Sequence, residues 1–565
     1  MATRTETKTQ KSAGKIAVRT KTKIPAETAT KKATHPKKEP VTSTTAGKKP
    51  AAKATTKSKP TTAANTSAKR KAAAAQPNGT AKKQKVVATT NDKKRKTPDE
   101  DDASPAPTSK KVKTAAKGAI ITEPPTDRLK VFVFGEGTAG ELGLGTAKKA
   151  VDVKRPRLNP NLDPQVVGVT QVEAGGMHVV ALTHDNKVLT WGVNDQGALG
   201  RDTEWDGGFK DMDAAMKESD GSDSEEEEDD NGLNPKECVP GEVDWSSVEL
   251  PEGTRFVDVT AGDSCSFALT DDGHVYGCGT FRGNEGVFGF AQDVEIAKRP
   301  ILIAGLKHIV SIKAGANHAL ALDSNGAVFA WGSGQQMQLG RRVVERTKLG
   351  GLQPREFGLP KSKKAHIVAI GTGGYHSFAI ANNGDVYSWG LNSFGQTGHT
   401  AGAGDDEAVI LKPTVIQSLR GKTIISLHGG SHHSVAATAD GECLIWGRVD
   451  GRQMGMSTST INDLPEDTVI RDDKNEPRII SVPTAIPTID GKVAVVAAMS
   501  DHNVVVTEAG RAYSWGFSAN YQTGQGTIDD IVEATMIDNT AVRDTVLTGA
   551  TAGGQFSIVT AKVTN

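Results

Sequence analysis

Side chains that could carry covalent or metal chemistry are few in this chain of 565 residues, and their spacing forms no catalytic pattern. The cysteines show neither Cys-x-x-Cys spacing nor a matching set of histidines, which argues against a structural zinc site and is typical of a reduced intracellular compartment. There is no nucleophile–base pair and no complete Gly-x-x-x-x-Gly-Lys-Ser/Thr loop, so we expect no covalent catalysis, metal or other cofactor. The four cysteines are Cys238, Cys265, Cys278 and Cys443.

The histidines, in contrast, recur in one sequence context, Ala-Gly-x-x-His. This segment occurs as Ala174–His178 and again as Ala314–His318. Because the histidine returns at the same place in each copy, we expect it to hold neighbouring repeats together through a hydrogen bond. A contact role for it remains the alternative. The repeated histidines are His178, His318, His376 and His502.

A second recurring element is an aromatic–glycine or similar pair that ends a short apolar run, as in Lys187–Gly192. Successive copies lie 57, 87, 53, 58, 57 and 69 residues apart, and the long step of 87 contains an acidic insert at about 202–232. An internal repeat with a period in the mid-fifties constrains the architecture more than any single residue does. The seven glycines are Gly135, Gly192, Gly279, Gly332, Gly390, Gly447 and Gly516.

Each repeat has the pattern of several short β-strands. Runs such as Val386–Trp389 are β-branched or aromatic, and turn signals such as Asp272-Gly273 and Asn383-Gly384 separate them. No stretch shows a sustained apolar period of 3.6 residues. Seven such units favour an all-β fold, a seven-bladed β-propeller, over a linear solenoid.

The two ends of the repeat region complement each other. The first unit opens at Val131–Gly135 without a preceding Ala-Gly-x-x-His segment, and the last copy of that segment, Ala552–Phe556, has no aromatic–glycine strand after it. A linear stack would need capping repeats at both ends. We therefore expect the N- and C-terminal strands to pair and close the ring, which leaves no open sheet edge.

Over about residues 128–562, these motifs resemble the regulator of chromosome condensation family. The resemblance implies a seven-bladed propeller that acts as a guanine-nucleotide exchange factor for the small GTPase Ran. The segment Gly279–Gly289 replaces the usual Gly-x-Leu-Gly ending of one repeat and resembles the wedge that this family presses against Ran. The segment Asn194–Thr203 also resembles that exchange factor more closely than its looser relatives.

The resemblance implies which residues form the wedge. Arg282 is its main charge, and Gly283 and Gly286 permit a tight turn. An irregular loop between two blades is the structural alternative. The implied wedge residues are Phe281, Arg282, Asn284, Glu285, Val287 and Phe288.

Further Ran contacts are implied in loops at the start of the blades. The most important aspartate of the family falls at Asn317, where its charge is absent although the side chain can still accept a hydrogen bond. Thr138 replaces an acidic residue of the family, and Phe556 replaces a histidine. The implied contact residues are Asp263, Asn317, His432 and His178.

A long loop beyond Gly340 carries several arginines. The family docks on the acidic histone patch of the nucleosome with arginines from a loop in this region, and arginine can grip carboxylates bidentately. Solvated surface charge is an equally good explanation. If the loop binds nucleosomes, we expect Ran and chromatin to use different parts of the propeller. The implied residues are Arg341, Arg342, Arg346 and Arg355.

Residues 1–127 are expected to be a disordered basic arm. Residues 1–118 hold 30 of the 68 Lys and Arg residues but only 8 Asp and Glu, with almost no aromatics. Such an arm should bind DNA non-specifically and, through its clusters, an import receptor that carries the protein to the nucleus, unless it only improves solubility. The clusters are Lys69, Arg70, Lys82, Lys83, Lys85, Lys93, Lys94, Arg95 and Lys96.

Two further expectations complete the interpretation. The insert holds 14 acidic and 2 basic residues between 202 and 230 and is expected to be a disordered loop within the 128–562 propeller. No apolar run approaches 18 residues and the N-terminus has no apolar signal core, so we expect no membrane span and no secretion. The alternative function is a chromatin- or nucleosome-binding propeller scaffold that has no exchange activity.

Overall fold

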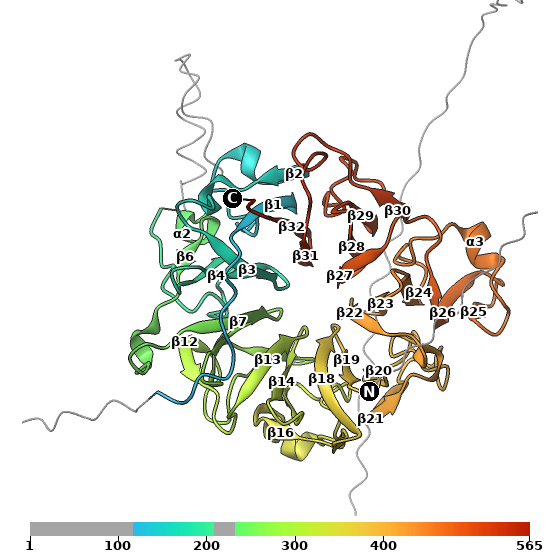
Figure 1. Cartoon of the computed structure of the whole chain (residues 1–565), viewed down its shortest axis with the longest axis horizontal. Helices are drawn as coiled ribbons and strands as arrows, with labels where there is room; N and C mark the ends of the chain where they lie inside the picture. Colours follow the sequence, from blue (N-terminus) through green and yellow to red (C-terminus); the bar gives the residue numbers. More distant parts are fainter. Residues whose placement is uncertain (1–116, 208–231, 565) are drawn as a thin grey trace, which may run out of the picture. The chain divides into compact units, whose positions relative to one another are not determined.

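The computed structural model describes residues 117–207 and 232–564, and most of their strands form seven antiparallel sheets around a central axis (Figure 1). Each of these sheets is a blade of four or five strands, and one further two-stranded sheet stands apart. The all-β, seven-bladed propeller predicted from the repeat is therefore confirmed. In the described residues no helix is both long enough and apolar enough to span a membrane.

The first four blades have these strands, in hydrogen-bonded order. Blade one comprises β31 (Gly549–Ala552), β32 (Phe556–Lys562), β1 (Leu129–Glu136) and β2 (Asp152–Leu158). Blade two comprises β3 (Val169–Ala174), β4 (His178–Thr183), β5 (Val188–Gly192) and β6 (Gly241–Glu242). Blade three comprises β7 (Phe256–Ala261), β8 (Cys265–Thr270), β9 (Val275–Gly279) and β12 (Ala297–Leu302). Blade four comprises β13 (Ile309–Ala314), β14 (His318–Asp323), β15 (Val328–Gly332) and β16 (Arg355–Glu356).

The remaining blades and the helices follow the same plan. Blade five comprises β17 (Lys361–Ser362), β18 (Ala365–Thr372), β19 (His376–Ala381), β20 (Val386–Leu391) and β21 (Val409–Val415). Blade six comprises β22 (Ile424–Gly429), β23 (His433–Thr438), β24 (Cys443–Arg448), β26 (Pro477–Ala485) and β25 (Val469–Arg471). Blade seven comprises β27 (Val493–Met499), β28 (His502–Thr507), β29 (Ala512–Gly516) and β30 (Ile531–Met536). The helices are α2 (Pro235–Cys238), α3 (Thr458–Asn462) and the 3-10 turns η1 (Lys148–Ala150), η2 (Pro160–Leu162), η3 (Trp245–Ser247), η4 (Glu345–Leu352) and η5 (Gln417–Leu419).

Blade one is assembled from both ends of the repeat region. Strand β1 pairs antiparallel with β32 from Leu129 opposite Lys562 to Gly135 opposite Phe556. The two strands lie side by side at the top of Figure 1, where the blue and red ends of the colour scale meet. The predicted closure by the N- and C-terminal strands is confirmed.

The repeated tryptophans explain why the aromatic–glycine pair recurs. Trp191 of blade two is fully buried, and its Nε1 donates a hydrogen bond of 2.9 Å to the Glu141 carbonyl of blade one. Trp389 of blade five makes the same contact with the Gln338 carbonyl of blade four, at 2.8 Å. Each indole thus fills the space between two blades and satisfies a turn of the preceding one.

The repeated histidines also lie between blades, as predicted. His178 Nε2 of blade two is hydrogen-bonded to Ser266 Oγ of blade three at 2.9 Å. Equivalent contacts join four more pairs of neighbouring blades. They are His318 with Ser377, His376 with Ser434, His433 with Asn503 and His502 with Ser557, at 2.7–2.9 Å. Cys265 and Phe556 occupy this position in blades three and one and are also buried.

Residues 117–127 differ from the prediction that a disordered arm extends to 127. Lys117 Nζ lies 2.7 Å from Asp271 Oδ2, and the Ile121 amide donates to the Asp271 carbonyl at 2.8 Å. Arg255 Nε also contacts this carboxylate, at 3.3 Å. The Asp271 side chain is fully buried, and a buried carboxylate is stable only with such partners. This segment, called the strap below, therefore packs on blade three.

Candidate functional site

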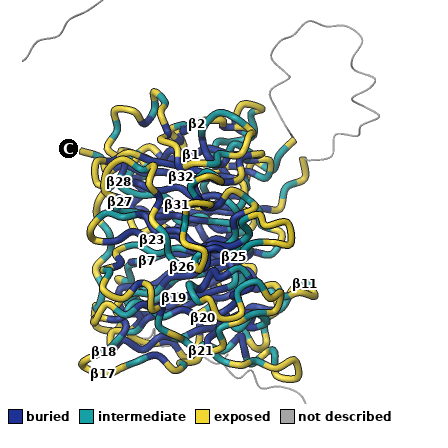
Figure 2. The backbone as a smooth tube through the Cα atoms, turned by 90° about the vertical axis from the view of Figure 1, so that its right-hand side faces the viewer, coloured by how far each residue is buried: buried dark blue, intermediate teal, exposed yellow. Residues whose placement is uncertain are grey.

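The segment predicted as the wedge is a β-hairpin that projects from blade three. Strands β10 (Phe281–Gly283) and β11 (Gly286–Gly289) pair antiparallel, with Arg282 opposite Val287. In Figure 2 the strand β11 stands out at the right-hand edge of the molecule, with exposed residues at its tip. Gly286 has a φ of +107°, which an L side chain rarely adopts, so a glycine fits this turn.

The phenylalanine that starts the hairpin does not face a partner. Phe281 is completely buried, and its ring stacks on Phe267 and Phe290 with centroids 6.1 and 5.9 Å apart. Phe281 lies in the segment predicted as the wedge, but its side chain anchors the hairpin in the core and does not face a partner. Phe288 is half-buried against the same cluster. The side chains left exposed are those of Arg282, Asn284, Glu285 and Val287.

The hairpin takes the place of the turn that other repeats have here. The surroundings of Trp331 in blade four show the effect of this replacement. Its indole is buried in blade four, but its Nε1 has no hydrogen-bond partner, unlike that of Trp191 or Trp389. The carbonyl that the Gly-x-Leu-Gly turn supplies in other blades is absent from blade three. The Phe267 ring, 5.6 Å away edge to face, covers the indole instead. An unsatisfied buried donor of this kind costs about 1–3 kcal/mol.

Two polar side chains join the base of the hairpin to the neighbouring loops. The Arg282 amide donates to Asn317 Oδ1 at 2.6 Å, and Asn317 Nδ2 donates to Asp263 Oδ2 at 3.4 Å. The structure thus brings together three of the predicted contact residues. Asn317 uses both ends of its amide, whereas an aspartate at this position could not donate to Asp263.

Asp263 lies in an unusual electrostatic position. Burial raises the pKa of its carboxyl from 3.8 to about 6, while the positive charge of Arg282 and the hydrogen bond from Asn317 oppose the rise. Its negative charge is therefore weakly stabilised in the free protein. A cation brought by a partner would find an incompletely compensated carboxylate there.

The two predicted histidine contacts have different positions. His178 is only 1% exposed and bonded between blades, so its prediction as a Ran contact is wrong. His432 precedes the buried repeat histidine His433 and lies at the surface of the loop, half-buried. Its ring is 5.0 Å from Phe394 and 6.0 Å from Tyr375, and burial lowers its pKa.

Tyr375 and Phe394 belong to the same surface and were missed by the sequence analysis. Tyr375 occupies the position before a repeat histidine that Asn317 and His432 occupy in their blades. That shared position was the available signal. For Phe394 the sequence gives no such signal. Its contact is with the guanidinium of Arg448, 5.1 Å from the ring centroid, and Arg448 belongs to another blade and is distant in sequence.

Residues 130–559 match the family described as RCC1-like domain. The chain belongs to this family. The RCC1-like chain is 41% identical over 440 residues to Protein pim1 of Schizosaccharomyces pombe, which covers 78% of this chain and 76% of that protein. It is 40% identical over 435 residues to the guanine nucleotide exchange factor SRM1 of Saccharomyces cerevisiae, covering 76% and 86%.

Solved structures agree with this family assignment. The structure of Prp20p from Saccharomyces cerevisiae, reported with its binding properties to Gsp1p and histones, has a TM-score of 0.69 and 37% identity, covering 79% of this chain and 94% of that chain. Yeast RCC1 (Prp20) bound to Kap60 has a TM-score of 0.68 and 36% identity, covering 82% and 97%.

The arginine loop of the RCC1-like chain contains one structural and three exposed arginines. Arg341 donates to the carbonyls of Ala330 at 2.9 Å and Gln353 at 3.2 Å, and burial lowers its pKa to about 10. Its guanidinium is thus bound to the backbone, and its role as a nucleosome contact stays a prediction. Arg201 makes the equivalent clamp on Thr190 in blade two. Arg342, Arg346 and Arg355 are exposed.

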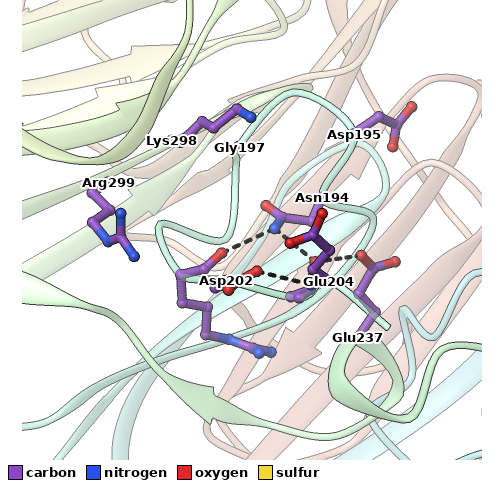
Figure 3. Close-up of a pocket in the computed structure, with 10 residues that line it drawn as sticks. Asn194, Asp195, Gly197, Asp202, Glu204, Glu237, Lys298 and Arg299 are labelled. Atoms are coloured by element: carbon purple, nitrogen blue, oxygen red, sulfur yellow. Dashed lines mark hydrogen bonds between the residues drawn. The ribbon is translucent and has the colours of Figure 1, made fainter. Parts of the chain in front are cut away.

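The segment 194–203, which resembles the family closely, lines a polar cleft of about 500 Å³ between blades two and three (Figure 3). Within it, Asn194 Nδ2 donates to Thr203 Oγ1 at 2.9 Å, and Thr203 Oγ1 donates to Glu237 at 2.7 Å. These bonds tie residue 203, at the start of the acidic insert, to residue 237, which follows it. The cleft therefore holds the two ends of the insert together.

Several predictions fall outside the described residues. The basic clusters at 69–71, 82–85 and 93–96 and the insert residues 208–231 belong to this group. Among the residues described, no group of three or more histidine, cysteine or acidic side chains is arranged to hold a metal ion. All four cysteines are buried.

Proposed function

We propose that this protein is a guanine-nucleotide exchange factor for a Ran-type small GTPase. The observation that supports this most directly is the hairpin of blade three, which replaces a repeat turn and projects Arg282 and Val287 from a buried aromatic anchor. It occurs in a chain that is 40% identical over 435 residues to a named exchange factor.

The proposed mechanism involves binding energy and no covalent step. An exchange factor that binds the nucleotide-free GTPase more tightly than the nucleotide-bound one weakens nucleotide binding by the same factor. The hairpin would press on the GTPase with Arg282, while Asp263 and His432 contact it from the neighbouring loops. A rigid hairpin is needed, because a flexible one would bend instead of distorting the nucleotide site.

The test is release of a fluorescent GDP analogue from Ran with catalytic amounts of the full chain. We expect acceleration that falls at least about tenfold on Arg282→Ala, as for a central contact residue. The matched control is Arg420→Ala. Arg420 is an exposed arginine that pairs with Asp385 in the turn between β19 and β20, away from the hairpin. No acceleration by a folded wild-type chain would rule out exchange and leave the scaffold function.

A second proposed activity is attachment to chromatin. Arg342, Arg346 and Arg355 are exposed, and their guanidinium groups suit an acidic histone patch; the similar Prp20p was studied for its binding to histones. We expect Arg342→Ala with Arg346→Ala to weaken binding to purified nucleosomes, whereas Lys187→Ala, an exposed lysine of blade two, leaves binding unchanged. Equal affinities of both variants would exclude the loop as the nucleosome contact.

The basic clusters of residues 69–96 are proposed to bind an import receptor and place the protein in the nucleus. The support is their composition and the similarity to yeast RCC1, whose structure was solved with Kap60. Non-specific DNA binding by the same basic segment would fall steeply with salt, because each neutralised phosphate releases counterions. Deleting residues 1–116 should therefore remove both nuclear import and salt-sensitive DNA binding.

A further inference from the structure

The hairpin of β10 and β11, called the exchange hairpin below, is too small to keep a fixed orientation by itself. Strand β10 has three residues and β11 has four, and an isolated two-stranded hairpin is at best marginally stable in water. A Cβ placed on Gly286 would meet nothing within 4 Å, whereas one on Gly283 would lie 3.0 Å from Gln335 Oε1, outside the hairpin. The orientation of the tip must therefore be determined by what surrounds it.

The polar contacts of the tip come from blade four. The Asn284 amide donates to Gln335 Oε1 at 2.9 Å, and Lys348 Nζ of η4 lies 3.1 Å from Glu285 Oε2. A second carboxylate, that of Glu345, fixes the same lysine at 2.6 Å. Both sides of the turn are thus attached to the segment that follows β15.

The base of the hairpin has an apolar contact with the same segment. Leu352, the last residue of η4, is 3% exposed and belongs to the buried cluster of Phe281 and Phe290. A Cβ on Gly289 would lie 3.0 Å from Leu352 Cδ1, so β11 and the end of η4 are in close contact. Gln353 also contacts Gln292, just beyond the hairpin.

We propose that residues 335–352 of blade four support the exchange hairpin, with Gln335 and Lys348 as positioning residues. This inference rests on the proposed exchange function. The two residues orient the hairpin tip and keep it from bending when the GTPase binds. Arg282 and Val287 make the contact with the GTPase. The expectation that Ran and chromatin use separate parts of the propeller changes accordingly, because the arginine loop supports the wedge.

The first test needs no GTPase. Hydrogen–deuterium exchange of amides 281–289 is measured in the full chain for two variants. Gln335→Leu keeps the side-chain size and removes the hydrogen-bond acceptor, whereas Gln335→Glu keeps the acceptor. Loss of one hydrogen bond should make Gln335→Leu exchange about fivefold faster at the hairpin, while Gln335→Glu stays near wild type. Lys348→Glu, which places a third carboxylate beside Glu285 and Glu345, should also loosen it. Unchanged hairpin protection in Gln335→Leu and Lys348→Glu would overturn the proposal.

The second test measures GDP release from Ran by the same variants. Gln335→Leu and Lys348→Glu should lower the maximal rate about fivefold, with Gln335→Glu and the distant Lys187→Glu active. If the hairpin loosens while the maximal rate stays at the wild-type value, the positioning role is wrong. If wild type itself releases no GDP, the exchange function fails, and the first test still decides whether blade four holds the hairpin.

Discussion

At the scale of single residues, Asn317 joins the hairpin to a carboxylate without adding a second negative charge. Its amide accepts from the Arg282 N–H and donates to Asp263. An aspartate there, as the family resemblance implies, would place a second carboxylate beside that of Asp263, and their repulsion would raise the pKa of the pair further. The chain therefore keeps the acceptor that the wedge needs and places its negative charge on Asp263 alone.

Asp263→Asn should stabilise the fold at neutral pH while weakening exchange. The folded carboxyl has a pKa of about 6 against 3.8, so it retains its proton where the unfolded one has lost it. Ionised Asp263 thus lowers stability progressively as pH rises from about 4 to 6, by up to about 3 kcal/mol at pH 7. Thermal denaturation should show a higher melting temperature for the variant at pH 7 than for wild type, with little difference at pH 4. Equal shifts at both pH values would contradict the assignment.

Phe281→Ala should unfold the protein more easily, because the side chain fills a buried site between Phe267 and Phe290. Removing a buried phenylalanine costs about 3–5 kcal/mol. Urea denaturation measures the change in the free energy of unfolding. Val287→Ala on the opposite strand of the hairpin is the matched control, since Val287 is 39% exposed and its truncation should change stability little. A similar small effect at both positions would show that Phe281 is not an anchor.

At the scale of elements, the strap and the hairpin lie at opposite ends of blade three. The strap binds the turn between β8 and β9 through Asp271, whereas the hairpin leaves the far end of β9 at Gly279. Lys117, the first of the described residues, therefore lies at the end of the blade that does not carry the hairpin.

Removing the strap should destabilise the propeller. A chain starting at 128 loses Lys117, which pairs with the buried Asp271 carboxylate, and leaves this group to Arg255 alone. We expect a loss of about 1–3 kcal/mol relative to a chain starting at 117. Differential scanning calorimetry of the two chains and of Asp271→Asn in the longer one checks this. Identical melting temperatures for the two lengths would mean that the strap contributes nothing.

At the scale of the whole molecule, five imidazoles hold the ring together and make it acid-sensitive. Burial lowers the pKa of His178, His433 and His502 to about 4 and that of His318 to about 3, and it also lowers that of His376. In the unfolded chain they take up protons below about pH 6.5. The stability that depends on their neutral form is therefore complete above pH 6.5 and lost as pH falls toward 4.

Urea unfolding at pH 7.5, 6.5 and 5.5 should show this loss. Each buried histidine contributes a decrease of about 1.4 kcal/mol by pH 5.5, so several together should lower the midpoint markedly. The carboxyls whose pKa burial raises act in the opposite direction; they are those of Asp263, Asp258, Glu141 and Glu237. The exposed His184, which is not one of the five histidines bonded between blades, provides the control site for a His→Gln substitution. A midpoint that is constant from pH 7.5 to 5.5 would contradict the role of the buried histidines.

The parts of the structure that repeat could be predicted from the sequence, and the parts that depend on distant neighbours could not. The histidines and the ring closure recur in a fixed context, so their place in one copy predicts the others. Phe281 was predicted as a wedge residue from its place in the sequence alone. Its burial could not be predicted, because it depends on Phe267 and Trp331 from other strands. The backbone hydrogen bonds of Arg341 were not predicted either, because the sequence does not distinguish it from the exposed arginines of the same loop. Arg201, at the same repeat position, also donates to a backbone carbonyl.

The pairing of β1 with β32 also determines when, during its own synthesis, the protein can become a ring. Strand β32 is made about 420 residues after β1. At roughly 5–20 residues per second, β1 and β2 wait about 20–80 s for their partner strand. Until then blades two to seven form an open arc, whatever their individual stability. A premature stop codon anywhere before 556 would therefore have one common result, a chain that never closes.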